Sequence, residues 1–218
     1  MTDSVKGNER PSTTGLLLHS AVTYDLMVWF ITRGREKALR EEMLRLARLQ
    51  PGESVLDVGC GTGSLAIAAK RKVGPAGAVH GVDASPEMIA RATKKARNAG
   101  VEVTFKNAFA QSLPFQDGTF DAVLSTVMLH HLPRPARKEL ALEIRRVLRP
   151  GGRLLLIDFG ASDKGKKRFL DHFHRRHGHV EFKDVVAMLG GAGLRVTETG
   201  ELAMRGLQFV LASLSCCA

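Results

Sequence analysis

The stretch of sequence that decides the fold is Val55-Leu56-Asp57-Val58-Gly59-Cys60-Gly61-Thr62-Gly63-Ser64. A short apolar run closes on an acidic residue, three glycines follow at alternate positions, and residues 65–70 have a helical pattern. This order predicts a buried strand, a tight glycine-rich turn and the N-terminus of a helix. Backbone N–H groups at such a helix N-terminus are expected to point toward a bound ligand.

The spacing of the glycines indicates which kind of ligand the turn binds. A dinucleotide-binding turn has its third glycine three residues after the second, and Ser64 occupies that position here. Asp57, which lies just before the turn, would repel a phosphate and attract an ammonium group. The loop is therefore predicted to bind a zwitterion.

The segment from Asp57 to Gly63 resembles the first motif of the class I S-adenosylmethionine-dependent methyltransferases, in which this loop holds the methionine half of the cofactor. Further segments follow in the order of that family, so that the motifs cover residues 55–160. The resemblance implies S-adenosylmethionine as cofactor. It also implies an α/β fold with a Rossmann-like, seven-stranded, mostly parallel sheet, helices on both faces and an antiparallel last strand. The residues that it assigns to the methionine end are Asp57, Gly59, Gly61 and Gly63, and Cys60 of the same loop is also predicted to bind the cofactor.

A second acidic residue, Asp83, ends an apolar strand predicted over residues 78–83. It lies about twenty residues beyond the loop, the distance at which an acid meets ribose hydroxyls in nucleotide-binding units. Ser85 then caps a helix that has Pro86 in its first turn and runs to Asn98. The resemblance implies that Asp83 binds both ribose hydroxyls and that Met88 packs on adenine, and Ala84 is also predicted to bind the cofactor. A strand-terminal Asp by itself is more often a cap.

The third strand is predicted over residues 101–106, and residues 107–115 after it resemble a family motif ending in Leu-Pro-Phe. Phe109 stands where the family usually has an Asp or Asn that accepts from the adenine amino group. Recognition of adenine is therefore left to three alternatives: backbone groups around Ala108, the side chain of Asn107, or stacking on Phe109.

The fourth strand is predicted over Phe120–Thr126 and contains Ser125, a predicted cofactor-binding residue. The residues at its end count against two reaction types. Methyltransferases of nucleic-acid amino groups have Asn or Asp, two prolines and an aromatic residue at its end, which this chain lacks. Metal-dependent catechol methyltransferases need carboxylates after the fourth and fifth strands, and only Asp158 is present. No metal is expected, and nucleic acid is an unlikely partner.

His130 and His131 are predicted at the start of a helix that runs to about Leu148. By the resemblance, His130 falls on the substrate side of the cofactor and is the candidate general base. A structural role remains the alternative for His130 and is the expected one for His131. A turn over residues 149–152 then leads into the fifth strand, residues 153–160.

The segments on either side of this core are less typical. Residues 1–14 are expected to be disordered, and residues 15–50 are expected to form helices over the pocket, including one from about residue 35 to 49. Tyr24-Asp25 resembles a pair found in ubiquinone/menaquinone C-methyltransferases. Residues 161–218 are expected to form the substrate side, with a helix over 181–189 ended by two glycines and strands over 194–199 and 207–214. Residues 172–179 contain four histidines, which are a compositional cue for metal and no more.

Composition limits the class of protein. The 218 residues are 44% hydrophobic and 25% charged, and they predict a single domain beyond residue 14. No apolar run of roughly 18 residues and no signal peptide are seen, so a cytoplasmic protein is expected. The net charge of +10 favours anionic partners, including peripheral contact with an anionic membrane surface.

Together these features predict an enzyme that transfers a methyl group from S-adenosylmethionine to a small-molecule or lipid-like acceptor. A quinone, phenol or phospholipid is the expected class of acceptor. Two alternatives remain: an RNA or protein methyltransferase, which the charge favours, and a non-catalytic partner protein that binds the cofactor.

Overall fold

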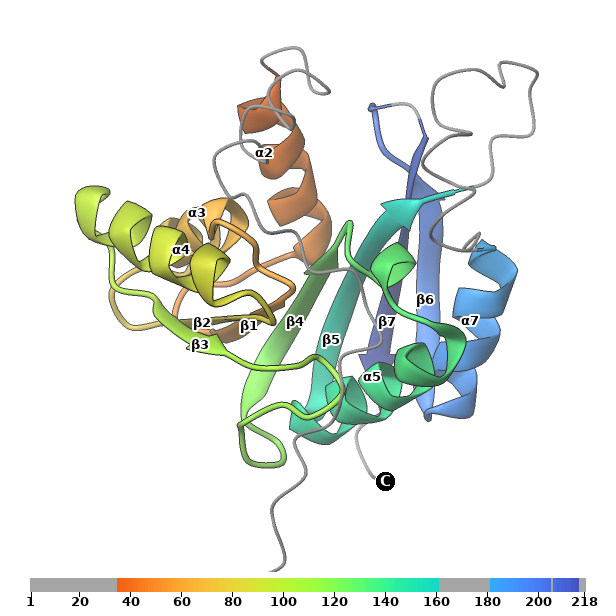
Figure 1. Ribbon diagram of the computed structural model, residues 1–218. Helices are drawn as coiled ribbons and strands as arrows, with labels where there is room; N and C mark the ends of the chain where they lie inside the picture. Colours follow the sequence, from red (N-terminus) through yellow and green to blue (C-terminus); the bar gives the residue numbers. More distant parts are fainter. Residues whose placement is uncertain (1–34, 161–180, 205, 216–218) are drawn as a thin grey trace, which may run out of the picture.

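The computed structural model describes residues 35–160, 181–204 and 206–215, and its strands form one seven-stranded sheet in the order β3-β2-β1-β4-β5-β7-β6 (Figure 1). The strands are β1 Ser54–Val58, β2 Ala78–Asp83, β3 Thr104–Asn107, β4 Phe120–Thr126, β5 Leu148–Phe159, β6 Leu194–Glu201 and β7 Leu207–Leu214. The helices are α2 Glu36–Ala47, α3 Ser64–Val73, α4 Pro86–Asn98, the 3-10 helix η1 Leu129–His131, α5 Arg134–Val147 and α7 Phe182–Gly191. β7 runs antiparallel to β5 and β6. The predicted Rossmann-like fold is confirmed.

Two helical layers cover the sheet because side chains along each strand alternate between its faces. Leu56 and Val58 of β1 pack on the face covered by α5 and α7. Val55 packs on the other face with α2 and α3. Figure 1 shows α5 and α7 close together and away from α3 and α4. Strands buried on both faces explain the nearly continuous apolar runs in the sequence.

The order of the strands has a topological switch point between β1 and β4. β1 pairs with β2 on one side and with β4 on the other, all three parallel. The connections that follow β1 and β4 therefore leave the sheet in opposite directions. In open α/β sheets, ligands bind outside the carboxyl ends of the strands at such a switch point.

Helix α4 confirms the signals at its two ends. The hydroxyl of Ser85 accepts the backbone N–H of Met88 at 3.3 Å, and Pro86 occupies the first turn. Gly100 follows the helix with φ +64°, a conformation that favours glycine.

The first helix after β4 differs from the prediction. His130 and His131 lie in η1, and α5 begins only at Arg134. Leu132 is extended, with ψ 137°, because a residue before proline is disfavoured in the helical region. Pro133 thus separates the histidines from the helix that was expected to carry them.

Smaller differences concern element bounds. β3 begins at Thr104, and β5 includes the predicted turn over residues 149–152. α7 contains the two glycines that were expected to end it, and Gly193, with φ +83°, follows it instead.

Helix α2 confirms the helix expected near residues 35–49, and β5 anchors its C-terminus. Arg153 donates to the carbonyl oxygens of Ala47 at 2.7 Å and Arg48 at 2.8 Å, and pairs with Glu53 at 2.7 Å.

Tyr24-Asp25 and the histidine tract 172–179 lie outside the described residues. Within the described residues, no helix has the length and apolar character needed to cross a membrane.

Candidate cofactor and acceptor site

The carboxyl ends of β1, β2, β4 and β5 bring the predicted site residues to one edge of the sheet. Asp57 lies at the end of β1 and Asp83 at the end of β2. Ser125, near the end of β4, pairs in register with Val58. Asp158 lies near the end of β5. Residues scattered over a hundred positions of sequence thus lie along one edge of the sheet.

The glycines of the loop are required by backbone conformation and by packing. Gly59 and Gly63 have φ +75° and +76°. A Cβ atom on Gly59 would lie 2.5 Å from Cγ of Met128, and one on Gly63 would lie 2.7 Å from Cζ of Phe105. The loop therefore packs beneath Met128 on one side and against β3 on the other.

Most backbone N–H groups of the loop donate hydrogen bonds within the protein. The N–H groups of Gly59 and Cys60 both donate to the carbonyl oxygen of Val82 at 2.9 Å. Gly61 donates to Asp83 Oδ2 at 2.9 Å, and Gly63 donates to the Cys60 carbonyl at 2.9 Å. These four donors precede the N-terminus of α3, whose own N–H groups at residues 64–66 are the ones predicted to point toward a ligand; that expectation stays a prediction. The four loop donors are used within the protein, so a polar contact with a ligand must come from elsewhere.

Asp57 offers that contact. Its side chain is 1% exposed, and neither carboxylate oxygen has a hydrogen-bond partner among the described residues. Burial, and then the nearby charge of Asp83, raise the pKa of Asp57 to about 7. The backbone N–H of Ala66 offsets part of this rise without reaching hydrogen-bond geometry. A buried carboxylate without a partner is costly, and a ligand ammonium group would remove that cost.

Ser125 supplies a second unsatisfied group on the neighbouring strand. Its hydroxyl is buried, and no described residue hydrogen-bonds with it. Adjacent strand ends thus carry a buried carboxylate, Asp57, and a buried hydroxyl, Ser125, that have no hydrogen-bond partner among the described residues. These two groups fit the amino-acid end of S-adenosylmethionine.

Asp83 accepts one backbone N–H at each carboxylate oxygen, from Ser85 to Oδ1 and from Gly61 to Oδ2, both at 2.9 Å. Burial raises its pKa, and these two donors oppose the rise. Asp83 therefore acts as a local cap, the alternative role expected for an Asp at the end of a strand. Each oxygen keeps a second lone pair, so binding of ribose hydroxyls remains a prediction.

The segment after β3 is fastened to Asp83. The amide nitrogen of Asn107 donates to the Asp83 carbonyl at 2.9 Å, and the N–H of Ala108 donates to the same oxygen at 3.1 Å. Asn107 thus has a structural partner, which weakens it as the group that reads adenine. Ala84, Ala108 and Phe109 are all partly exposed near this junction, and their contacts with the cofactor stay predictions.

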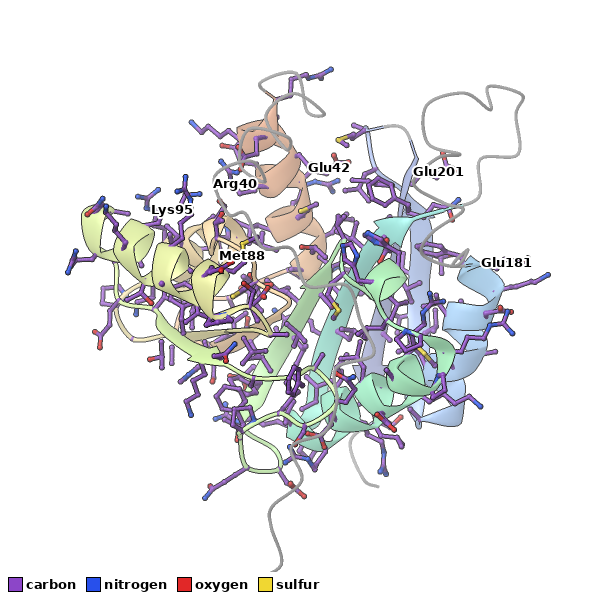
Figure 2. The ribbon with its side chains drawn as sticks, viewed as in Figure 1. Arg40, Glu42, Met88, Lys95, Glu181 and Glu201 are labelled. Carbon is purple, nitrogen blue, oxygen red and sulfur yellow. The ribbon has the colours of Figure 1, made fainter. Side chains whose placement is uncertain are left out.

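Met88 and Cys60 are both buried, with different consequences. Met88, at 3% exposure, lies in the first turn of α4 (Figure 2), where packing on adenine stays a prediction. The thiol of Cys60 is turned toward β2, where a Cβ atom on Gly81 would lie 3.0 Å from its sulfur. Burial raises the pKa of this thiol. A contact between Cys60 and the cofactor stays a prediction.

Lys95 forms a hydrogen bond between α4 and the start of α3. Lys95 Nζ donates to the hydroxyl of Ser64 at 2.6 Å. Ser64 is the residue that stands where a dinucleotide-binding turn would have glycine. The position is thus used to fix the loop between two helices.

His130 pairs with Asp158 across the ends of β4 and β5. His130 Nδ1 lies 2.8 Å from Asp158 Oδ1, and the His130 backbone N–H donates to Oδ2 at 3.1 Å. Sequence reasoning considered Asp158 only as a metal ligand and missed this pairing. The signal that was available is the parallel pairing of the fourth and fifth strands, which brings the segment after β4 that carries His130 beside the end of β5 that carries Asp158. Among the described residues, no group of His, Cys, Asp and Glu forms a metal site.

The turn that carries His130 begins with a strained residue. Val127 has φ +53°, an unusual conformation for a β-branched side chain. Its N–H donates to the Ile157 carbonyl at 2.7 Å, which holds the strained turn against β5. Such strain is found where surrounding structure fixes a functional geometry. Here it places Met128 against Gly59 and starts η1.

Comparisons with known proteins agree with this geometry. A family model described as a methyltransferase domain matches residues 55–152. The demethylmenaquinone methyltransferase of Thermus thermophilus is 37% identical over 172 residues, which cover 78% of this chain and 73% of that protein. The chain belongs to the class I S-adenosylmethionine-dependent methyltransferases.

Further similarities place the methyltransferase near the quinone-biosynthesis group. The ubiquinone/menaquinone biosynthesis C-methyltransferase of Burkholderia mallei is 33% identical over 171 residues, 78% of this chain and 69% of that protein. The crystal structure of a SAM-dependent methyltransferase from Aquifex aeolicus has a TM-score of 0.69 at 26% identity. The match covers 80% of this chain and 89% of the Aquifex aeolicus chain. The predicted enzyme class and cofactor are confirmed, and the individual residue roles stay predictions.

Proposed function

We propose that this methyltransferase methylates a quinone-type or phenolic small molecule. The observation that carries the proposal is its similarity, over 78% of its length, to two enzymes named for menaquinone or ubiquinone biosynthesis. The pairing of His130 with Asp158 supports it, because acceptors with acidic hydroxyl protons benefit from a base. Phospholipids remain a second acceptor class of similar apolar character.

S-adenosylmethionine supplies an electrophilic methyl group when bound. Asp57 would hold its ammonium group, Asp83 its ribose hydroxyls, and Met88 with Phe109 its adenine. The glycine loop then fixes the position of the methyl group relative to the acceptor. Alignment of the reacting atoms and exclusion of water are the main tasks left to the protein.

The basic charge supports a further part of the proposal. We place the enzyme in the cytoplasm. Its net charge of +10 would draw it to anionic membrane surfaces, where apolar acceptors collect. The charge also keeps an RNA or protein acceptor as the alternative. A cofactor-binding partner protein without activity would show tight cofactor binding and no methylated product.

The test is methyl transfer from radiolabelled S-adenosylmethionine into cell extract, followed by separation into organic, aqueous small-molecule and macromolecular fractions. The proposal expects label in the organic fraction, and transfer to a purified dihydroxynaphthalene bearing an isoprenoid chain. Asp57→Ala should abolish this label. Asp121→Ala, at the opposite edge of the sheet where it accepts the Ser54 N–H at 2.8 Å, should retain it. Label confined to macromolecules would refute the proposed acceptor.

A further inference from the structure

The ends of β4 and β5 hold a histidine and a carboxylate in a fixed arrangement. Asp158 is 0% exposed and accepts three hydrogen bonds. Oδ1 accepts from His130 Nδ1 at 2.8 Å and from the Phe159 backbone N–H at 2.7 Å. Oδ2 accepts from the His130 backbone N–H at 3.1 Å. Backbone donors on two elements thus prevent the carboxylate from turning.

We propose that Asp158 is a positioning residue that makes His130 the general base of the methyl transfer. The inference rests on the proposed function, because it assigns a proton acceptor for the ring hydroxyl of the methyl acceptor. It adds a residue, Asp158, and a defined protonation pattern for the imidazole ring.

The protonation pattern follows from donor and acceptor chemistry. An ionised carboxylate can only accept hydrogen bonds, and each oxygen of Asp158 already accepts a backbone N–H. His130 Nδ1 must therefore carry the ring proton of the neutral imidazole. Nε2 is left with a lone pair, which is the state that a general base needs.

Surrounding groups hold the ring and its short helix in place. The His130 ring is flanked by the ring of His131, with centroids 3.9 Å apart, and by Phe159 at 5.4 Å. Arg137 Nε donates to the carbonyl oxygens of Leu129 at 3.1 Å and Leu132 at 2.7 Å. These bonds fasten both sides of η1, so the imidazole is fixed through its backbone and through Asp158.

The side chain of His130 nevertheless keeps 12% of its surface exposed, while Asp158 keeps none. The pair therefore presents the imidazole, and not the carboxylate, to an incoming molecule. This division matches the roles of base and orienting group in other histidine–carboxylate pairs.

The step balances without an oxidant or reductant. His130 Nε2 accepts the proton of the acceptor's ring hydroxyl, while the ring carbon forms a bond to the methyl carbon and the sulfur–methyl bond breaks. The imidazolium then returns its proton to the ring oxygen as the ring carbon loses its own hydrogen to solvent as a proton. One methyl group is transferred and one proton is released.

The experiment compares His130→Gln, Asp158→Asn and the double variant, with a purified dihydroxynaphthalene acceptor. The amide of Asp158→Asn can donate to Nδ1, which moves the ring proton to Nε2. We expect kcat to fall by about 10²-fold or more in each single variant, and the double variant to be no slower than His130→Gln. The dissociation constant of S-adenosylmethionine, measured by calorimetry, should change less than about threefold, because neither residue is assigned to the cofactor.

A spectroscopic readout tests the inference on the resting protein, without any acceptor. The ¹⁵N signals of the His130 ring are identified by their loss in His130→Gln. They should show a protonated Nδ1 in the parent protein and a protonated Nε2 in Asp158→Asn. Asp121→Asn, which removes a carboxylate charge at the opposite edge of the sheet, should leave these signals and kcat unchanged.

The outcomes separate the two proposals. A protonated Nε2 in the parent protein, or full kcat in both single variants, would overturn the assignment of Asp158 and His130 while the acceptor class stands. Failure of the parent protein to methylate any hydroxyarene would overturn the proposed function, and the ring signals would still decide the protonation pattern. If Asp158→Asn does not fold, His130→Gln and the parent spectrum carry the test.

Discussion

Replacing Asp57 with asparagine should remove a loss of stability that the cofactor-free parent protein undergoes as pH rises. The folded pKa of Asp57 is about 7, raised from 3.8 by burial and by Asp83. The folded state therefore keeps a proton that the unfolded chain has already lost, and the parent protein loses stability as pH rises from about 4 through 7. Three pKa units correspond to roughly 4 kcal/mol, of which about 2–3 kcal/mol is lost between about pH 5 and 8.

The assay is urea unfolding of the parent and Asp57→Asn at about pH 5 and 8, without cofactor. The buried amide has its own packing cost, which is the same at both pH values. The measured quantity is therefore the change with pH in the difference between the two free energies of unfolding. It should move in favour of Asp57→Asn by about 2–3 kcal/mol from the lower to the higher pH.

Asp121→Asn is the matched control. Burial opposes its ionisation, but the Ser54 N–H and Arg149 hold the pKa of Asp121 below its usual value. Asp121 is ionised in both folded and unfolded states over this pH range, so its difference from the parent should not change with pH.

Cofactor binding should show the opposite preference. A ligand ammonium group needs the ionised form of Asp57, so the affinity of the parent protein for S-adenosylmethionine should rise as pH passes about 7. Asp57→Asn should bind weakly with little of this pH dependence. A stability difference that stays flat with pH, together with unchanged affinity, would refute the view that Asp57 is an uncompensated carboxylate kept for the cofactor.

Three further outcomes are expected. Gly59→Ala should lower the free energy of unfolding by at least about 1–2 kcal/mol in denaturant titrations, because φ is +75° and the new Cβ would meet Met128. Asp83→Ala should weaken cofactor binding in calorimetry by on the order of 1–3 kcal/mol, since it removes a predicted ribose partner and the acceptor of the Gly61 N–H; unchanged affinity would remove it from the site. Arg153→Met should lower unfolding stability by on the order of 1–3 kcal/mol and expose α2 to proteolysis, because two helix-end carbonyls lose their donor. Equal proteolysis rates would contradict this anchoring role.

Much of the fold was predictable because its signals are local. The loop from Gly59 to Gly63, the cap at Ser85 and the apolar run of Phe120–Thr126 each specify structure within a few residues. Their order along the chain then specifies the sheet, since parallel strands joined by helices allow few topologies. Element bounds were less certain where glycines were numerous, as at the end of α7.

The helix expected to start at the two histidines shows where local signals conflict. The apolar spacing of the segment favours one long helix through Leu148, but Pro133 makes Leu132 extended. The break places His130 on the separate short helix η1, which follows β4 and contacts Asp158 at the end of β5, instead of on α5. A periodic pattern can therefore hide an interruption that matters for the site.

The roles of the strand-end acids were not predictable from their positions. Asp57, Asp83 and Asp158 each lie at the carboxyl end of a parallel strand, which the sequence indicated. Their partners differ. Asp57 has no hydrogen-bond partner among the described residues, Asp83 accepts two backbone N–H groups, and Asp158 accepts two backbone N–H groups and an imidazole.

These partner sets separate ligand binding from support. An acid without a partner destabilises the free protein and gains most from a cationic ligand. An acid with its oxygens already engaged gains little from one and acts on the groups that it holds. At three strand ends the same residue type is thus predicted to give a cofactor contact at Asp57, a loop support that keeps lone pairs for ribose hydroxyls at Asp83, and an orienting group at Asp158. This division depends on contacts between residues far apart in sequence.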